Sequence, residues 1–330
     1  KTLTIEPGTV IYGNDYTHSN KGSLIITKGA KIMAVGTPCR PIVFTSGLSN
    51  PHKRVRGDWG GVIILGKAAL NAPGDTAHIE GIPPTHFTLF GGGDHPKNND
   101  NSGTLQYVRI EYAGVALSPN NEINGLTFGA VGSGTTIDHV QVSYANDDSY
   151  EWFGGLVNCK YLIAFRGIDD DFDTDNGFSG KVQFGLGLRD PQVADVSKSH
   201  GFESDNDASG DLNLPQTRCI FSNITLDAGG NTTSNPLFEA GTYIRRNSHL
   251  FCYNSIVMGW PIGIYIDGTL SQNNVLADTL VGDNIIGVAN SANYVATVSP
   301  SGTADVIDLL MNHAGNRFYG GNGGILLKKP

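Results

Sequence analysis

Short turn-like pairs followed by a large apolar residue recur along the chain. Two examples are Asn176-Gly177-Phe178 and His200-Gly201-Phe202. The apolar anchors of these segments lie 24 to 36 residues apart, and they are Leu126, Phe153, Phe178, Phe202, Phe238 and Ile264. A repeat of this length is typical of solenoids and propellers, in which each repeat forms one structural unit.

A second set of segments precedes the anchors and alternates apolar with polar residues, as β-strands do. The clearest examples are residues 108–112, 140–144 and 162–165. No ten-residue amphipathic helix separates them, which excludes a βαβ protein. We therefore predict an all-β, single-stranded right-handed parallel β-helix of roughly 9–12 coils with capped ends. In this fold Phe153, Phe178 and Phe202 would stack as an aromatic ladder. A β-propeller is the main alternative, but the hairpins of its four-stranded blades are not visible.

The two ends of the chain have patterns of their own. Residues 1–46 contain short apolar segments, which we interpret as an N-terminal cap and the first coils. Residues 304–330 are interpreted as a C-terminal cap, with 304–313 as the helix candidate. The stretches 73–87 and 92–103 are polar and lack periodicity, as loops do. No linker divides the chain, so we expect one β-helix domain over residues 1–330.

The composition agrees with frequent turns and excludes some classes of binding partner. The chain of 330 residues contains 44 glycines and carries a formal net charge of −9. It has no Lys/Arg-rich run, which makes nucleic acid an unfavourable partner because phosphate binding needs clustered positive charge. No apolar stretch approaches the ~20 residues that cross a bilayer, so we expect no transmembrane segment.

The four cysteines are Cys39, Cys159, Cys219 and Cys252. They have neither CxxC spacing nor nearby histidines in a zinc pattern, which argues against a structural zinc site. Cys219 and Cys252 either pair across neighbouring coils or are buried free thiols.

Several segments resemble those of uncharacterised bacterial cell-surface and secreted β-helix proteins, often lipoproteins. The resemblance extends through Asp147 to Asp207 and is carried by Leu3-Thr4-Ile5-Glu6-Pro7-Gly8-Thr9, Gly29-Ala30-Lys31-Ile32, Pro41-Ile42-Val43-Phe44-Thr45-Ser46 and Gly57-Asp58-Trp59-Gly60-Gly61-Val62. It implies a pectate-lyase-like β-helix and an extracellular or outer cell-surface location. Lys1 to Pro7 contain no apolar signal segment, so the location rests on the resemblance. No reaction is implied, because this fold hosts lyases, hydrolases, esterases, adhesins and carriers.

The acidic residues are concentrated in one part of the chain. Residues 147–211 hold 14 Asp/Glu and 5 Lys/Arg, whereas the rest of the chain holds 17 of each sign. The whole net charge is therefore a local property of about three coils.

Stacking of these coils places carboxylates close together. With the Phe anchors as the register, Asp148 falls over Asp173, and Glu151 falls over Asn176 and His200. Stacked carboxylates repel one another unless a cation or a proton lies between them. We therefore predict a calcium site, and its candidate ligands are Asp148, Asp171, Asp173, Asp175, Asp205 and Asp207. The alternative is a solvated acidic ridge whose side chains satisfy turn backbones.

If the chain is an enzyme, two reactions on an acidic polysaccharide fit the fold. A calcium-dependent lyase needs a base beside the acids, and the candidates are Lys181, which falls near Asp205, together with Arg166 and Arg189. These three cations are otherwise solvated partners of the acidic ridge. A glycoside hydrolase would use two of Asp148, Glu151, Asp173, Asp175 and Glu203.

His200 lies beside Glu203 and Asp205, which makes it the histidine most suggestive of catalysis. Its other interpretation is a hydrogen-bonded structural residue. Together with Lys181, Arg166, Arg189 and Glu151 it completes the set of candidate catalytic residues.

Aromatic side chains near the acids suggest glycan binding, because sugar rings stack on flat aromatic faces. Candidate ligand-binding residues are Tyr150, Trp152 and Glu203, and further aromatics nearby are Tyr161, Trp260 and Tyr265. Two hypotheses stay open. One is a glycan-binding or structural surface protein, and the other is a lyase or hydrolase. A cation poised over the acids favours the enzyme, whereas cations tied up in ion pairs favour the binding protein.

Overall fold

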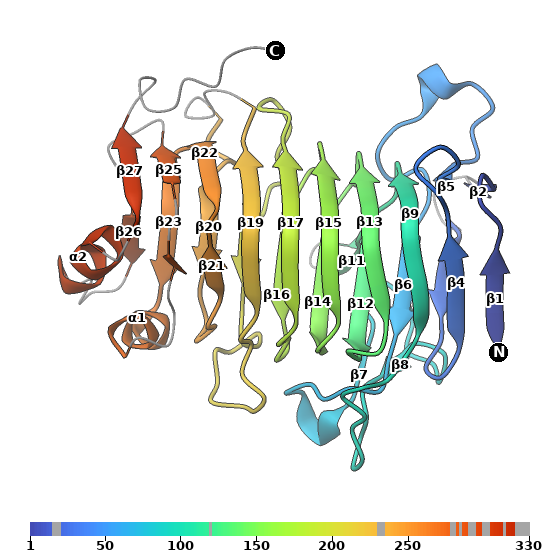
Figure 1. The fold of residues 1–330 in the computed structure, drawn as a ribbon, viewed down its shortest axis with the longest axis horizontal. Helices are drawn as coiled ribbons and strands as arrows, with labels where there is room; N and C mark the ends of the chain where they lie inside the picture. The colour runs from blue at the N-terminus through green and yellow to red at the C-terminus, as the bar shows by residue number, and fades with distance from the viewer. Residues whose placement is uncertain are drawn as a thin grey trace.

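The computed structural model describes residues 1–14, 21–118, 121–229, 235–277, 282–283, 286–289, 295–298, 304–312 and 315–320. Within these residues the strands form two large parallel sheets that wind along one axis (Figure 1). The N-terminus lies at one end of this axis, and helices α1 (Thr269–Leu276) and α2 (Ala304–Asn312) lie at the other. The predicted all-β parallel β-helix is confirmed.

Sheet A, with 14 strands in the described residues, contains the long strands. Its main path is β1 (Thr2–Ile5), β4 (Lys31–Val35), β9 (Gly103–Glu111), β13 (Thr136–Ser143), β15 (Asn158–Phe165), β17 (Lys181–Leu188), β19 (Ile220–Asp227), β22 (Ile256–Trp260), β25 (Ile286–Ala289) and β27 (Arg317–Gly320). Four more strands pair beside this path, and they are β2 (Val10–Gly13), β5 (Ile42–Ser46), β21 (Phe251–Tyr253) and β24 (Gly282–Asp283).

Sheet B, with nine strands in the same part of the chain, carries the acidic segments. In spatial order it contains β26 (Val295–Val298), β23 (Ile262–Asp267), β20 (Ala240–Ile244), β18 (Phe202–Ser204), β16 (Phe172–Asp175), β14 (Tyr150–Gly155), β12 (Leu126–Val131), β6 (Gly61–Leu65) and β3 (Ser23–Ile26). Two antiparallel hairpins project from the coils, β7 (Ala77–His78) with β8 (Leu89–Phe90) and β10 (Val115–Ser118) with β11 (Asn121–Ile123).

The core is filled by stacked side chains from neighbouring coils. Tyr150 pairs with Phe172, and Phe172 pairs with Phe202. Their ring centroids are 5.5 and 5.7 Å apart, and all three side chains are fully buried. The predicted ladder of Phe153, Phe178 and Phe202 is therefore wrong in register. His200-Gly201 precedes β18, whereas Asn176-Gly177 follows β16. The turn-like pairs therefore do not mark one fixed point of the coil, and inward stacking decides which residues pair.

The outer face of sheet B is covered at one end. The segment between β6 and β9 contributes Leu70, Ile79 and Phe90 to a cluster against Leu65 and Phe153. Phe153 thus packs under this segment, outside the main core. The same segment reaches past β16, because Asn71 N donates to Asn176 O at 3.0 Å and Asn71 Nδ2 donates to Asn206 O at 2.7 Å.

The C-terminal end is closed by helices. Helix α2 packs on β26 and on α1, and its Val306 and Leu310 join the core. The helix predicted at 304–313 is confirmed as Ala304–Asn312, and the rest of the predicted cap lies partly outside the described residues. Helix α1 was not predicted. No helix in the described chain has the length and apolar character of a membrane span.

All four cysteines are free thiols, so the disulfide alternative for Cys219 and Cys252 is wrong. Cys159, Cys219 and Cys252 are buried and Cys39 is exposed. Burial raises the pKa of the Cys252 thiol to about 11, which keeps it protonated and unreactive.

Candidate functional site: the acidic cluster of sheet B

A row of carboxylates crosses the outer face of sheet B. Alternate residues of a strand face opposite sides, so the residues next to the core aromatics point outward. Glu151 pairs with Asp173, and Asp173 pairs with Glu203. The row continues into Tyr243 and Tyr265, whose rings stack at 4.8 Å.

Further acids come from the turns before these strands. Asp147 and Asp148 precede β14, Asp169 and Asp170 precede β16, and His200 precedes β18. The backbone holds these turns in step, because Ser149 N donates to Asp170 O at 2.9 Å and Asp171 N donates to His200 O at 3.3 Å. Together with the outward row they form one acidic cluster, which divides into two halves.

We call the first part the cation-poor half, which consists of Asp147, Asp148, Glu151, Asp169 and Asp173. Carboxylate oxygens of Asp147, Asp148 and Asp169 lie within 4.8 Å of one another, and so do those of Asp148, Glu151 and Asp173. Asp148 therefore belongs to both groups. Asp147, Asp148 and Glu151 are more than nine-tenths buried.

Few hydrogen bonds stabilise the charges of this half. Asp148 Oδ1 accepts from Asp170 N at 2.8 Å, and Glu151 accepts from Asn124 Nδ2. The Oδ1 atoms of Asp169 and Asp173 are buried without a hydrogen-bond partner. Burial, followed by the charges of Glu122 and Glu80, raises the pKa of Asp147 well above its ordinary value.

Burial and mutual repulsion both raise the pKa values of the carboxyl groups in the cation-poor half. Burial, followed by the charges of Asp170 and Asp147, raises the pKa of Asp148 well above its ordinary value. The pKa of Glu151 is raised by burial and then by Glu80 and Asp173. Glu80 reaches the cluster from the segment covering sheet B, and burial together with Glu122 raises its pKa to about 7. These carboxylates need either protons or an added cation.

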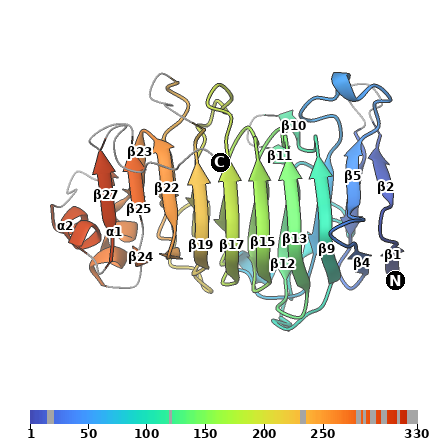
Figure 2. The ribbon, with the colours of Figure 1, turned by 45° about the horizontal axis from the view of Figure 1, so that its top comes forward.

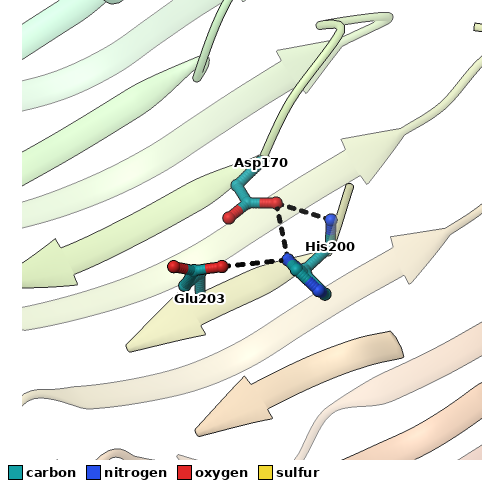
Figure 3. A group of neighbouring side chains, drawn as sticks. All are labelled: Asp170, His200 and Glu203. Atoms are coloured by element: carbon teal, nitrogen blue, oxygen red, sulfur yellow. Dashed lines mark hydrogen bonds and ion pairs between the residues drawn. The ribbon is translucent and has the colours of Figure 1, made fainter. Parts of the chain in front are cut away.

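The cation-rich half consists of Asp170, His200, Glu203, Asp205, Arg245 and Arg246. His200 Nδ1 lies 3.0 Å from Asp170 Oδ1 and 3.1 Å from Glu203 Oε2 (Figure 3). Its Nε2 lies 3.3 Å from Glu239 Oε2. Burial alone would lower the pKa of His200, but these carboxylates raise it well above the ordinary value. The buried ring is therefore an imidazolium that donates from both nitrogens.

Two arginines complete the neutralisation of this half. Arg245 pairs with Glu203 and, through Nε at 2.8 Å, with Asp205. Arg246 Nη1 lies 2.7 Å from the second oxygen of Asp205. Burial would raise the pKa of Glu203, but the hydrogen bond from His200 and the charges of His200 and Arg245 lower it. Glu203 is therefore ionised at neutral pH.

The structure brings together only some of the predicted metal ligands. Asp148 and Asp173 lie in the cation-poor half, with Glu151 from the catalytic candidates. Asp175 lies next to them on β16, and burial with the charge of Asp205 raises its pKa to about 8. The predicted overlay of Asp148 on Asp173 is wrong, because Glu151 is the residue opposite Asp173.

Three other predicted ligands are already engaged. Asp171 forms a fully buried ion pair with Arg189 at 3.2 Å. Asp205 is neutralised by the two arginines. Asp207 holds a turn, since its Oδ1 accepts from Ser209 N at 2.9 Å and from Asp211 N at 3.1 Å. The Asp207 carboxylate is therefore used by its own turn.

None of the cations proposed as a lyase base faces the acidic row. Lys181 is exposed on β17 of sheet A, opposite Ile220, so its predicted position near Asp205 is wrong. Arg189 is buried against Asp171. Arg166 follows β15, and its Nη1 lies 3.9 Å from Asp190 Oδ2.

The aromatic candidates also need correction. Tyr150 and Trp152 are fully buried core residues, as is Trp260, so they cannot stack on a ligand. Tyr161 is 42% exposed, but it lies on sheet A. Glu203 and Tyr265 remain beside the acidic cluster.

Sequence reasoning missed residues that the fold brings in from a distance. Asp147, Asp169 and Asp170 lay inside recognised acidic runs, and their place at strand starts was the available signal. Arg245, Arg246 and Glu239 come from the next coil, about 40 residues along the chain. No short-range pattern connects them to His200 or Asp205.

A scan of family models finds one match, described as a pectate-lyase-like beta helix domain, over residues 1–323. A search of curated proteins and a search of solved structures returned no match.

Proposed function

Because the chain belongs to the family of pectate-lyase-like β-helix domains, a membership that supports a carbohydrate-related function, we propose that it is an exported bacterial surface protein that binds an acidic glycan through calcium. The cation-poor half is the calcium site of this proposal. Its ligands are Asp147, Asp148, Asp169, Glu151 and Asp173.

One observation carries the proposal, namely a buried set of carboxylates that forms no ion pair with a Lys, Arg or His among the described residues. Calcium binds six to eight oxygens at about 2.3–2.6 Å, so two of its ligands are at most ~5 Å apart. The oxygens of each group lie within 4.8 Å of one another, which fits this limit. The Oδ1 atoms of Asp169 and Asp173, which are buried without a hydrogen-bond partner, offer free ligand positions.

In this arrangement the carboxylates and the bound ion have different roles. The carboxylates of the cation-poor half hold the ion and remain ionised only while it is present. The ion supplies a positive charge that attracts a sugar carboxylate. Tyr243 and Tyr265 lie at the far end of the outward row, but their side chains are buried, so the ion carries the contact with the glycan.

Calcium titration of EDTA-treated protein by isothermal calorimetry tests the site directly. We expect one saturable binding event that Asp148→Asn abolishes, because Asp148 belongs to both carboxylate groups. Asp138→Asn is the matched control, since Asp138 lies on β13 of sheet A. Calcium-dependent retention on immobilised polygalacturonate then tests the glycan. No calcium heat in the wild-type protein would overturn the proposal.

A second candidate function is glycoside hydrolysis, and a pair of opposite pKa shifts favours it. Asp173 and Glu203 face each other on adjacent strands. Burial and the charge of Glu203 raise the pKa of Asp173, whereas Glu203 is ionised. Such divergence is what a general acid and its anionic partner require.

Release of reducing ends from acidic polysaccharides tests the hydrolase. Asp173→Asn and Glu203→Gln would each abolish release, and Asp138→Asn would leave it unchanged. Absence of product from the wild-type protein leaves calcium-dependent binding as the function. Unsaturated product absorbing in the ultraviolet would instead indicate a lyase that uses a base other than Lys181, Arg166 or Arg189.

A further inference from the structure

Sheet A carries a row of rings at strained backbone positions. Four successive long strands each contain one ring at positive φ, namely Tyr107 at 50°, His139 at 51°, Tyr161 at 56° and Phe184 at 64°. The next strand places Asn223 at 60°. A side chain other than Gly pays roughly 1–2 kcal/mol for this conformation, and Asn tolerates it better than most. Rings therefore occupy positions where Asn would be less costly.

These four rings form one continuous ridge, which we call the aromatic ridge. Successive ring centroids are 4.4, 4.3 and 4.9 Å apart, with interplanar angles of 14° to 26°. Tyr161 is 42% and Phe184 38% exposed, so the ridge lies at the surface. Figure 2 shows the strands that carry it, β9, β13, β15 and β17, side by side.

A groove of about 600 Å³ runs beside the ridge. Its floor is the outward row Arg109, Gln141, Ile163, Leu186 and Thr225, which are paired across five strands. The loop residues Thr37, Pro38 and Pro41 also line it. This volume is typical of ligand-binding sites, and four strands at ~4.8 Å spacing give the ridge a length of about 14 Å.

The lining indicates an uncharged, hydroxyl-rich ligand. Its two basic members, Arg109 and His139, are paired with Glu111 and Asp138. The remaining lining is apolar or carries amides and hydroxyls, such as Gln141 and Asn223. A sugar chain matches this mixture, with C–H faces for the rings and hydroxyls for the amides.

We propose that this groove is a second glycan site that binds an uncharged oligosaccharide segment, separate from the acidic cluster on sheet B. The choice of a glycan among uncharged ligands rests on the proposed function. The two sites would let one protein hold a neutral and an acidic stretch of polysaccharide on different faces.

Isothermal calorimetry with cellohexaose, xylohexaose and mannohexaose tests the groove. EDTA is present throughout, so that calcium at the acidic cluster cannot contribute. The double variant Tyr161→Asn, Phe184→Asn copies the residue that β19 already has at this position, which keeps the backbone conformation while removing two rings. We expect at least one of the three oligosaccharides to bind, and the double variant to weaken it about tenfold or more.

Tyr144→Asn is the matched control. Tyr144 also has positive φ, at 57°, and stacks on Tyr112 at 5.2 Å, but it does not line the groove. Its substitution should leave the affinity unchanged. Equal weakening by Tyr144→Asn, or no binding of any of the three oligosaccharides, would overturn the inference.

Gln141→Trp provides an independent variant, because it fills the groove from the floor without changing the ridge. It should abolish binding, and it decides the matter if the double variant does not fold. Calcium binding without oligosaccharide binding would defeat this inference alone. Oligosaccharide binding without calcium binding would defeat only the proposed calcium site.

Discussion

The two halves of the acidic cluster have similar carboxylates in similar surroundings, but only one has its own cations. In the cation-rich half, His200 and two arginines face Asp170, Glu203 and Asp205. In the cation-poor half, the charges acting most strongly on Asp148 are all carboxylates. Burying an unpaired charge costs several kcal/mol, so the cation-poor half is stable only when its carboxylates bind protons or an ion from solution. The difference separates a structural charge network from a candidate binding site.

The largest expected loss of stability comes from removing one cation from the cation-rich half. His200→Gln leaves Asp170, Glu203 and Glu239 without their shared imidazolium. Removing one member of a buried ionic network costs about 3–5 kcal/mol. We expect a loss of this size in urea unfolding at pH 7. The exposed loop substitution His95→Gln is the control and should change stability by less than about 0.5 kcal/mol.

Calcium should act on the cation-poor half alone. An ion that binds only the native state stabilises it by about 2.7 kcal/mol at one hundred times its Kd. Thermal melts with calcium and with EDTA should therefore differ for the wild-type protein and coincide for Asp148→Asn. An unchanged wild-type melt would remove the basis for treating the two halves differently.

The metal-free protein should lose stability as the pH rises from about 5 to 8. Burial, partly offset by Arg189, raises the pKa of Asp171 to about 7, and burial with the charge of Asp205 raises the pKa of Asp175 to about 8. The native state thus binds more protons than the unfolded chain between the unfolded pKa of ~4 and these folded values. The stabilisation present in full below pH ~4 is lost as the pH rises to the folded pKa values and stays lost above them.

His200 contributes with the same sign, because its pKa is also raised and its stabilisation is lost as the pH rises through the folded value. Each group contributes at most about 1.4 kcal/mol per pH unit. Urea unfolding at several pH values measures the slope, and calcium should flatten it. A slope of the opposite sign would show that the buried carboxyls are already ionised and compensated.

The smallest effects should differ in sign between the halves. Asp148→Asn without calcium removes repulsion while an amide oxygen still accepts from Asp170 N, so we expect about 1 kcal/mol of stabilisation. Glu203→Gln removes a paired charge and should cost about 1–3 kcal/mol. Lys181→Gln on sheet A is the neutral reference. Destabilisation of equal size by Asp148→Asn and Glu203→Gln would contradict the division.

The fold class followed from the repeat pattern because every coil must turn and stack, which leaves apolar anchors and turn residues at regular intervals. The register did not follow, because loops of different length separate Tyr150, Phe172 and Phe202. Because the predicted ladder was out of register, we expected Asp148 opposite Asp173, where the structure has Glu151.

The cation-poor half was predictable where its residues are close in sequence. Asp148, Glu151 and Asp173 lie on neighbouring coils within one acidic stretch. Their missing counterpart, the cation set of Arg245 and Arg246, reaches Asp205 from the next coil after an irregular segment. Spatial pairing across about 40 residues leaves no local signal, so the division into two halves emerged only from the structure.

The placement of the carboxylates on successive coils also affects resistance to force. Each coil of a solenoid contacts only its neighbours, so a pull along the axis can detach coils one at a time. Asp148 precedes β14 and Asp173 lies on β16, and an ion bound by both would join two coils that are otherwise held by backbone hydrogen bonds and core stacking. If calcium binds as proposed, it would link two coils at the middle of the solenoid, and its removal would lower the force at which these coils separate.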